Sequence, residues 1–160
     1  MSIAYNAKKL IPDATEELED VYAPDHKPQT KNFKPQAGPD KRFVDGIKEA
    51  LHQSMVKHPN LILMGQDIAE YGGAFKITEG FVEEFGKARV RNTPICESAV
   101  VGAALGLSLE GHKAVMEMQF ADFVTVGFNQ IVNNLAKIYY RWGQNADVVI
   151  RMPTGGGVGA

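Results

Sequence analysis

The fold of this protein is decided by one stretch near its middle, Thr93-Pro94-Ile95-Cys96-Glu97-Ser98-Ala99-Val100-Val101-Gly102-Ala103-Ala104. A short apolar strand, predicted over residues 90–96, ends in this stretch, and a helix almost without charge, predicted over residues 98–110, follows it directly. Glu97 lies at the joint. Ligands of open parallel α/β sheets bind beyond the carboxyl ends of strands, so a functional carboxylate is expected here. A first-turn acid favoured by the helix dipole is the alternative, and the residue pattern alone leaves both open.

The segments on either side repeat this alternation of short apolar runs and helical patterns. Further strands are predicted over residues 61–64, 114–119 and 147–152. A short helix with Phe81 and Phe85 is predicted after a Tyr71-Gly72-Gly73 turn, and a long helix over residues 123–141. Such alternation is typical of a parallel sheet with crossover helices. The sequence therefore predicts an α/β fold with helices on both faces of a parallel sheet.

A further helix is predicted before the first of these strands. Its apolar residues recur at every fourth position, at Phe43, Ile47, Leu51 and Met55. We expect Asp40 as its N-cap, and His58-Pro59 ends the pattern.

Residues 1–40 have a different composition from the rest. Five of the eight prolines and an acidic run lie there, with few large apolar residues. The sequence predicts an extended arm or linker in this region. A solvated tail and an arm that wraps a partner subunit both remain open.

Charge and cysteine content limit the classes of function. The formal net charge is −2 and the basic residues are scattered, which argues against nucleic acid as a partner. The single cysteine, Cys96, cannot form an internal disulfide and suits a reducing compartment. Residues 1–10 lack the apolar core of a secretory signal, and no arginine precedes Arg42. The longest nearly apolar stretch, residues 99–109, is too short to cross a bilayer. We expect a soluble, cytoplasmic protein.

The glycine-rich end of the sequence follows the last predicted strand. Residues 155–160 satisfy the G-x-G-x-x-A pattern of dinucleotide sites, but the helix that would face the phosphate is absent from the sequence. An ordinary strand-to-loop turn is the favoured interpretation. Because no element follows that could pack against this loop, we expect that the chain stops inside a domain.

Other reactive residues suggest no site of their own. The four histidines have no metal-ligand spacing, and one cysteine excludes a thiolate cage. A buried packing thiol is favoured for Cys96 over a nucleophile, because no neighbouring base can be named.

Four segments carry a family resemblance. They are Met64-Gly65-Gln66-Asp67-Ile68-Ala69 with Tyr71-Gly72-Gly73, Asn92-Thr93-Pro94-Ile95-Cys96-Glu97, Glu117-Met118-Gln119-Phe120-Ala121-Asp122-Phe123, and Phe128-Asn129-Gln130-Ile131-Val132-Asn133 with Ala136-Lys137. In order and spacing these resemble the β subunit of the decarboxylating dehydrogenase component of 2-oxo acid dehydrogenase complexes, of the pyruvate and branched-chain types. The resemblance covers residues 41–160. Segments similar to residues 1–40 join the α and β parts in relatives that carry both on one polypeptide.

The resemblance implies a pyrimidine-binding, thiamine-diphosphate fold over residues 41–160, incomplete at its carboxyl end. In this family Glu97 would hydrogen-bond the ring nitrogen opposite the amino group and promote the imino tautomer that removes the thiazolium proton. Phe123 matches the aromatic that packs against the pyrimidine, Gln119 a polar pocket position, and Ile95 a pocket wall. Ala99 departs from the family, which usually has glycine there.

The resemblance also implies partners and ions. The diphosphate is held through Mg²⁺ by an α subunit or α domain, and the Gly-Asp-Gly and Asn used for this are missing here. Further partners would be a lipoyl-bearing acyltransferase core and a second β copy. The backbone of Ala146, Val148 and Val149 matches the first part of a potassium site in branched-chain relatives. Because the residues that hold the diphosphate are missing, we expect no activity without an α partner. The family's active-site histidine is also not in this sequence, so the substrate-contacting and acyl-transfer roles are not assigned to its residues.

The leading functional prediction is oxidative decarboxylation of a 2-oxo acid with acyl transfer to a lipoyl group. The sequence of residues 119–123 weakly favours branched-chain substrates. A transketolase-like or deoxyxylulose-phosphate-synthase-like enzyme is the alternative within enzymes. A non-catalytic assembly module with a vestigial pocket is the alternative outside them.

Overall fold

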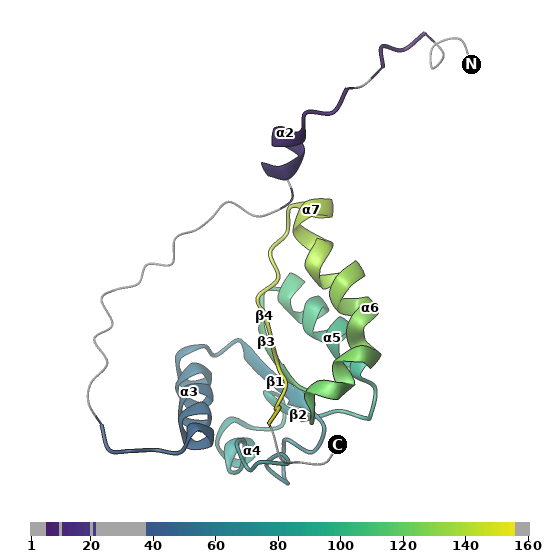
Figure 1. Cartoon of the computed structure of the whole chain (residues 1–160). Helices are drawn as coiled ribbons and strands as arrows, with labels where there is room; N and C mark the ends of the chain where they lie inside the picture. The colour runs from purple at the N-terminus through teal and green to yellow at the C-terminus, as the bar shows by residue number, and fades with distance from the viewer. Residues whose placement is uncertain (1–5, 10, 20, 22–37, 156–160) are drawn as a thin grey trace.

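The computed structural model describes residues 6–9, 11–19, 21 and 38–155, and its centre is a parallel sheet (Figure 1). The four strands of the described part are β1 (Leu61–Gly65), β2 (Val90–Asn92), β3 (Lys113–Glu117) and β4 (Val148–Arg151), in the order β2-β1-β3-β4. Every neighbouring pair is parallel. The predicted α/β class and parallel sheet are confirmed.

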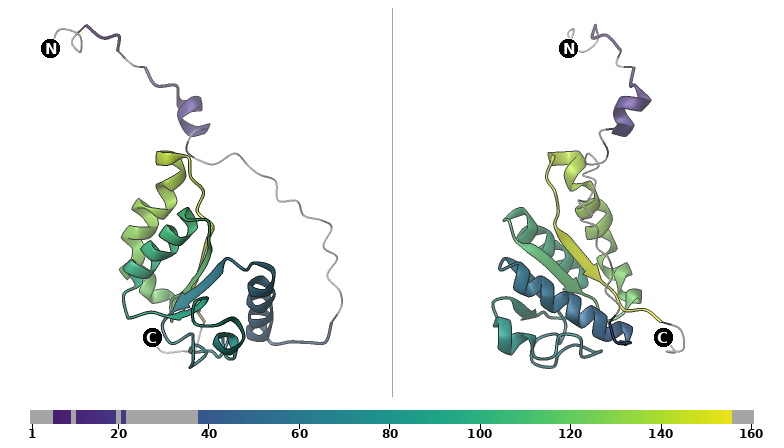
Figure 2. Two further views of the ribbon diagram at one scale, coloured as in Figure 1. Left: turned by 180° about the vertical axis from the view of Figure 1, so that it is seen from behind. Right: turned by 90° about the vertical axis from the view of Figure 1, so that its left-hand side faces the viewer.

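Helices cover both faces of this sheet (Figures 1 and 2). On one face lie α3 (Phe43–Lys57) and α4 (Phe81–Phe85). On the other lie α5 (Glu97–Leu109) and α6 (Val124–Asn133), and α7 (Ile138–Trp142) continues the line of α6 beyond the sheet. The predicted arrangement of helices on both faces is confirmed.

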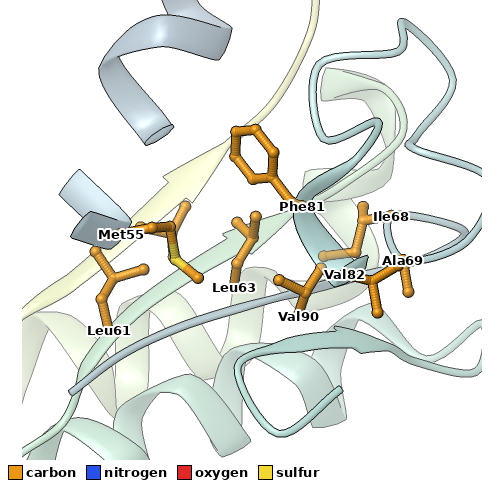
Figure 3. Close-up of a cluster of buried hydrophobic side chains, with 9 residues drawn as sticks. Met55, Leu61, Leu63, Ile68, Ala69, Phe81, Val82 and Val90 are labelled. Atoms are coloured by element: carbon orange, nitrogen blue, oxygen red, sulfur yellow. The ribbon is translucent and has the colours of Figure 1, made fainter. Parts of the chain in front are cut away.

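The core on the α3 side joins both helices to the sheet (Figure 3). Its buried side chains are Met55, Leu61, Leu63, Ile68, Ala69, Phe81, Val82, Val90 and Val115. Alternate strand residues point to opposite faces, so Leu61, Leu63 and Val115 share this side.

The core on the α5 side uses the other set of strand residues. It comprises Ile62, Met64, Val100, Val101, Ala104, Ala114, Met116 and Met118. Every residue of β1 is buried, as expected for the central strand of a sheet covered on both sides. The edge strand β4 is an exception, because Val149 is 55% exposed.

The N-terminal end of α3 differs from the prediction, whereas its carboxyl end, capped at His58, agrees with it. Asp40 is not its N-cap: Arg42 occupies that position and makes no side-chain capping bond, but its Nε donates to Asp45 Oδ2 at 2.8 Å in the first turn. The charge of Asp45 near the helix N-terminus supplies the favourable interaction expected of a cap. At the other end, the guanidinium of Arg89 donates to the carbonyl oxygens of Met55 (2.7 Å), His58 (2.8 Å) and Leu61 (3.1 Å). Arg89, which is distant in sequence, thus bonds carbonyl groups that the carboxyl end of α3 leaves without a helical partner.

The long helix predicted over residues 123–141 is broken. The 3₁₀ turn η1 (Ala121–Phe123) precedes α6, and a second turn, η2 (Leu135–Lys137), separates α6 from α7. Asn134 lies between α6 and η2 with φ −114° and ψ −66°, and its Nδ2 donates to Gln130 Oε1 at 2.5 Å. The φ of Asn134 departs from the helical value of about −63°, and α6 ends there.

The second strand is also shorter than predicted, since β2 ends at Asn92 and not at residue 96. Pro94 has no backbone N–H for a ladder, and the chain turns toward α5 there.

Within residues 1–40 the structure describes one short helix, α2 (Ala14–Glu19), none of whose residues is buried. The assignment of residues 1–40 as an arm or linker stays a prediction. Among the described residues, no helix has the length and apolar character needed to cross a membrane.

Candidate functional site at the carboxyl ends of the strands

The strand order creates a switch point between β1 and β3. The chain leaves β1 through α4 on one face and reaches β2, but it leaves β3 through α6 on the opposite face and reaches β4 on the other side. In open α/β sheets the crevice where two such connections diverge is the place where ligands bind. The residues that follow β1 and β3, Gln66-Asp67 and Met118-Gln119, therefore flank the expected binding crevice.

Glu97 lies beside this crevice as the first residue of α5, and it is only 7% exposed. Gln66, the residue directly after β1, donates from Nε2 to Glu97 Oε1 at 3.2 Å. Gln66 is itself 8% exposed. The pair joins the end of the central strand to the start of a helix, across 31 positions of sequence.

The second oxygen of Glu97, Oε2, has no hydrogen-bond partner among the described residues. The one fully buried side-chain oxygen or nitrogen without a partner in the described part is Thr93 Oγ1, so Glu97 Oε2 still reaches solvent. Burying a carboxyl group with one hydrogen bond is costly, and a residue that served only the helix dipole would not need burial. Burial with one free oxygen suits a group that receives a ligand.

Gly127 brings the start of α6 against the start of α5. A Cβ at this position would lie 3.1 Å from Met118 Cε, 3.3 Å from Val101 Cγ2 and 3.7 Å from the backbone oxygen of Glu97. A larger side chain would separate the two helices. The small residue thus keeps α6 close behind Glu97.

The other predicted pocket residues make no hydrogen bond to the carboxyl group of Glu97. Gln119 is half-buried, and its Nε2 makes a long 3.5 Å contact to Asp67 Oδ2. Phe123 ends η1, is 36% exposed and meets Phe120 edge to face at 5.9 Å between ring centroids. Ile95 is 83% exposed. In the single chain these apolar side chains form an open surface.

The predicted potassium ligands lie at and before the edge strand β4. Asp147 O accepts from Ala114 N at 3.1 Å and Arg151 O accepts from Met118 N at 3.0 Å, so these carbonyls point toward β3. Alternation along a parallel strand directs the carbonyl of Val149 the same way and that of Val148 toward the open edge. Ala146 lies two residues before β4. The carbonyls of Val148 and Val149 therefore point in opposite directions.

Two buried charges at the same end of the sheet were missed by sequence reasoning. Glu117, at the end of β3, is 4% exposed and pairs with Arg151 at the end of β4. Glu117 faces the α3 side, as Val115 does. A mainly apolar cavity of about 470 Å³ lies there, with Arg151, Phe43, Phe75 and Phe120 in its wall. Glu97 is not in that wall, so the two features are separate.

Gln66 was also missed, although a signal existed. It directly follows a predicted strand, and the rule that singled out Glu97 applies to it equally. Glu117 and Arg151 offered no such signal, because their pairing depends on the neighbouring positions of β3 and β4.

The remaining reactive residues are placed as follows. Cys96 is a free thiol that packs, partly buried, against the core on the α5 side. The part of the chain that the structure describes holds no cluster of three or more side chains suited to binding a metal. Of the glycine-rich end, residues 156–160 lie outside the described residues.

Together, the fold and the site define a parallel α/β domain with one buried, half-satisfied carboxyl group beside its switch point, where ligands of such sheets bind. The chain belongs to the family of the transketolase pyrimidine-binding domain, whose model matches residues 41–160. The resemblance seen in the sequence is confirmed.

Individual relatives agree with this family. The chain is 42% identical over 120 residues to pyruvate dehydrogenase E1 component subunit beta of Leifsonia xyli, covering 74% of this chain and 36% of the relative. It is 40% identical over 118 residues to 2-oxoisovalerate dehydrogenase subunit beta of Bacillus subtilis, covering 72% and 36%. It is 35% identical over 159 residues to the chloroplastic pyruvate dehydrogenase E1 component subunit beta-3 of Arabidopsis thaliana, covering 98% and 37%.

The shares covered have two consequences. The chain spans little more than a third of the length of the curated relatives it matches. The Arabidopsis alignment covers nearly the whole chain, so it includes most of the residues before residue 41.

Relatives from bacteria, mitochondria and chloroplasts occur, so the family does not identify a compartment.

Proposed function

We propose that this chain supplies the pyrimidine half of a thiamine diphosphate site in a 2-oxo acid dehydrogenase. The enzyme would decarboxylate its substrate oxidatively and transfer the acyl group to a lipoyl arm. The observation that carries the proposal is the state of Glu97: buried, held at one oxygen by Gln66 and open at the other. The kinship with pyruvate and 2-oxoisovalerate dehydrogenase β subunits supports the reaction class.

The residues present fit the cofactor's pyrimidine ring. Glu97 Oε2 offers a carboxyl oxygen that can share a proton with a ring nitrogen. Phe123 offers an aromatic face, Ile95 an apolar wall and Gln119 a polar contact at the crevice. Thiamine diphosphate, when bound, supplies the carbanion-stabilising chemistry that decarboxylation of a 2-oxo acid requires.

The work of this chain is to hold and move one proton. Glu97, when protonated, would donate from Oε2 to the ring nitrogen opposite the amino group, and this hydrogen bond would make the amino group of a bound ring more acidic. The buried position excludes most water from the carboxyl group and strengthens this hydrogen bond.

Exposed apolar side chains before α5 and on α6 are consistent with a shared site. Ile95 is 83% exposed, and Val126 and Phe128 are each 57% exposed. We propose that a partner covers them. We propose an α subunit or α domain as the partner, which would hold Mg²⁺ and the diphosphate. A second β copy and a lipoyl-bearing acyltransferase core complete the proposed assembly. Potassium near Ala146, Val148 and Val149 and a cytoplasmic location stay predictions.

The preferred substrate is open between pyruvate and branched-chain 2-oxo acids. The relatives of the two kinds are 42% and 40% identical to this chain, so identity does not separate them. The test below therefore uses both kinds of substrate.

The experiment measures carbon dioxide release and lipoyl acylation by the full-length protein with its α partner, thiamine diphosphate and Mg²⁺. We expect turnover with at least one of the two substrate kinds and a loss of about 10²- to 10⁴-fold in Glu97→Gln, because general acid–base groups contribute that much. Glu110→Gln, at the exposed opposite end of α5, is the matched control and should keep full activity.

Four outcomes would contradict the proposal. Two are an unchanged rate in Glu97→Gln and cofactor-dependent turnover by the isolated 160-residue chain. The third, cofactor binding without any turnover, would favour a non-catalytic assembly module. The fourth, ketol transfer between sugar phosphates in place of decarboxylation, would favour a transketolase-like enzyme.

A further inference from the structure

We infer that Gln66 is a positioning residue for Glu97, whose side-chain amide determines which of the two carboxyl oxygens carries the shared proton. The inference rests on the proposed function, because it concerns the proton that Glu97 would share with the pyrimidine ring. It assigns a role to a residue outside the predicted pocket set.

The position of Gln66 is fixed by the centre of the sheet. It follows β1 directly, and Gly65, the last residue of β1, is in register with Asn92 of β2 and Glu117 of β3. Gly65 O also accepts from Thr93 N at 2.9 Å. A strand bonded on both sides gives Gln66 little freedom, and its side chain is 8% exposed. The amide is therefore held rigidly against Glu97.

The chemistry of the contact separates the two oxygens of Glu97. The Gln66 Nε2 group is a donor and approaches Oε1 at 3.2 Å. If Oε1 carried the proton, the Gln66 donor would meet a weaker acceptor than a carbonyl oxygen. The contact therefore favours the proton of a protonated Glu97 on Oε2, with Oε1 as the carbonyl oxygen.

Oε2 is also the oxygen that can meet a ligand. It has no partner among the described residues and reaches solvent, whereas Oε1 is occupied by Gln66. Gln66 thus presents the proton on the side of the carboxyl group that is open to the crevice. Without the amide, the proton could lie on either oxygen and the carboxyl group could rotate.

Few other titratable groups belong to the elements that meet at this pair. They are Asp67 after β1, Arg91 on β2, Cys96 before α5, Lys113 and Glu117 on β3, and Asp122 on η1. Lys113 lies at the opposite end of β3 from this pair. Glu117 faces the opposite side of the sheet and is paired with Arg151. The helix α6, which packs behind Glu97, carries no titratable side chain.

The test uses the full-length protein with its α partner, loaded with thiamine diphosphate and Mg²⁺. It measures how fast the thiazolium proton of the bound cofactor exchanges with deuterium oxide, together with cofactor affinity and the pH dependence of turnover. Gln66→Met keeps the side-chain length but removes the donor. We expect exchange to slow by about 10- to 100-fold, because Glu97 Oε1 would be left as a buried acceptor without its donor, with cofactor affinity changed less than about threefold. Gln53→Met, on the exposed part of α3, should behave as the unmodified protein.

Gln66→Glu gives a second, isosteric readout. A protonated glutamate can donate to Glu97 Oε1, and an ionised one cannot. At acidic pH the exchange rate of this variant should therefore approach that of the unmodified protein. As pH rises, the ratio of the variant's rate to the rate of the unmodified protein should fall. Recovery confined to low pH would not follow from a merely structural role.

The outcomes separate this inference from the proposed function. Exchange at the unmodified rate in Gln66→Met, with exchange lost in Glu97→Gln, would overturn the role of Gln66 and leave the proposed function standing. Unchanged exchange in Glu97→Gln would overturn the proposed function itself. If Gln66→Met failed to bind cofactor, Gln66→Glu would decide: a pH dependence like that of the unmodified protein would overturn the inference.

Discussion

Arg151 at the end of β4 donates from Nε to Oε2 of Glu117 at the end of β3, at 3.0 Å, and its Nη2 pairs with the same oxygen. The side chains are 15% and 2% exposed, respectively. If either side chain were removed, the charge of the other would be left without a partner and largely shielded from solvent. The pair joins the edge strand to the centre of the sheet on the face opposite Glu97.

Arg151→Met should lower the free energy of unfolding by about 3–5 kcal/mol, because a buried carboxylate then loses its partner. Urea unfolding of the chain and the variant measures this. The double variant Glu117→Leu with Arg151→Met should recover most of the loss, since no unpaired charge remains.

The matched control for this prediction is the exposed pair of Lys41 and Glu49, whose charged atoms lie 2.6 Å apart. Lys41→Met should cost less than about 1 kcal/mol, because solvent screens surface pairs. Equal losses in Arg151→Met and Lys41→Met would show that burial does not set the strength of the Glu117–Arg151 pair.

Gly65 and Gly46 should respond oppositely to alanine. A Cβ at Gly65 would lie 2.8 Å from the backbone oxygen of Glu117, which the β1–β3 ladder holds in place, so Gly65→Ala should cost about 1–3 kcal/mol. A Cβ at Gly46, inside α3, would meet nothing within 4 Å, and Gly46→Ala should stabilise the chain by about 0.5–1 kcal/mol. Thermal or urea unfolding distinguishes the two signs. A stabilising Gly65→Ala would mean that β1 and β3 are less closely packed than described.

Glu70 should titrate below the usual glutamate range. The ion pair with Lys87, Nζ to Oε1 at 2.6 Å, is the main cause that lowers the pKa of Glu70, and Asn92 Nδ2 contributes from 3.1 Å. A lowered pKa in the folded state stabilises the fold above the unfolded-state pKa, and this contribution is lost as pH falls through the folded-state value. Lys87→Met should therefore raise the pKa of Glu70 and weaken the fold at neutral pH but not at strongly acidic pH.

Carboxyl chemical shifts followed by NMR as pH changes measure the titration of Glu70 directly. Lys57→Met, at the exposed end of α3, serves as the control and should leave that titration unchanged. A Glu70 titration that is the same with and without Lys87 would rule out the ion pair as its cause.

Much of the fold followed from local pattern. The buried apolar runs at β1 and β3 predict strands, and the fourfold repeat from Phe43 to Met55 predicts α3, because such spacing depends only on neighbouring residues. The predictions that failed concern element ends. Arg42 and not Asp40 is the N-cap of α3, and the long helix is interrupted at Asn134; the exact ends of elements are the least determined by local pattern.

By itself, the sequence determined that Glu97 stands between a strand and an apolar helix, and that the chain belongs among parallel α/β domains, since both depend on residues adjacent in the chain. Only the tertiary structure decided that Gln66 and Glu97, 31 positions apart, share a hydrogen bond, and that Glu117 finds Arg151. The strand order β2-β1-β3-β4 brings these residues together. That order is set by how two cores pack on opposite faces of one sheet, and no local pattern of residues encodes it.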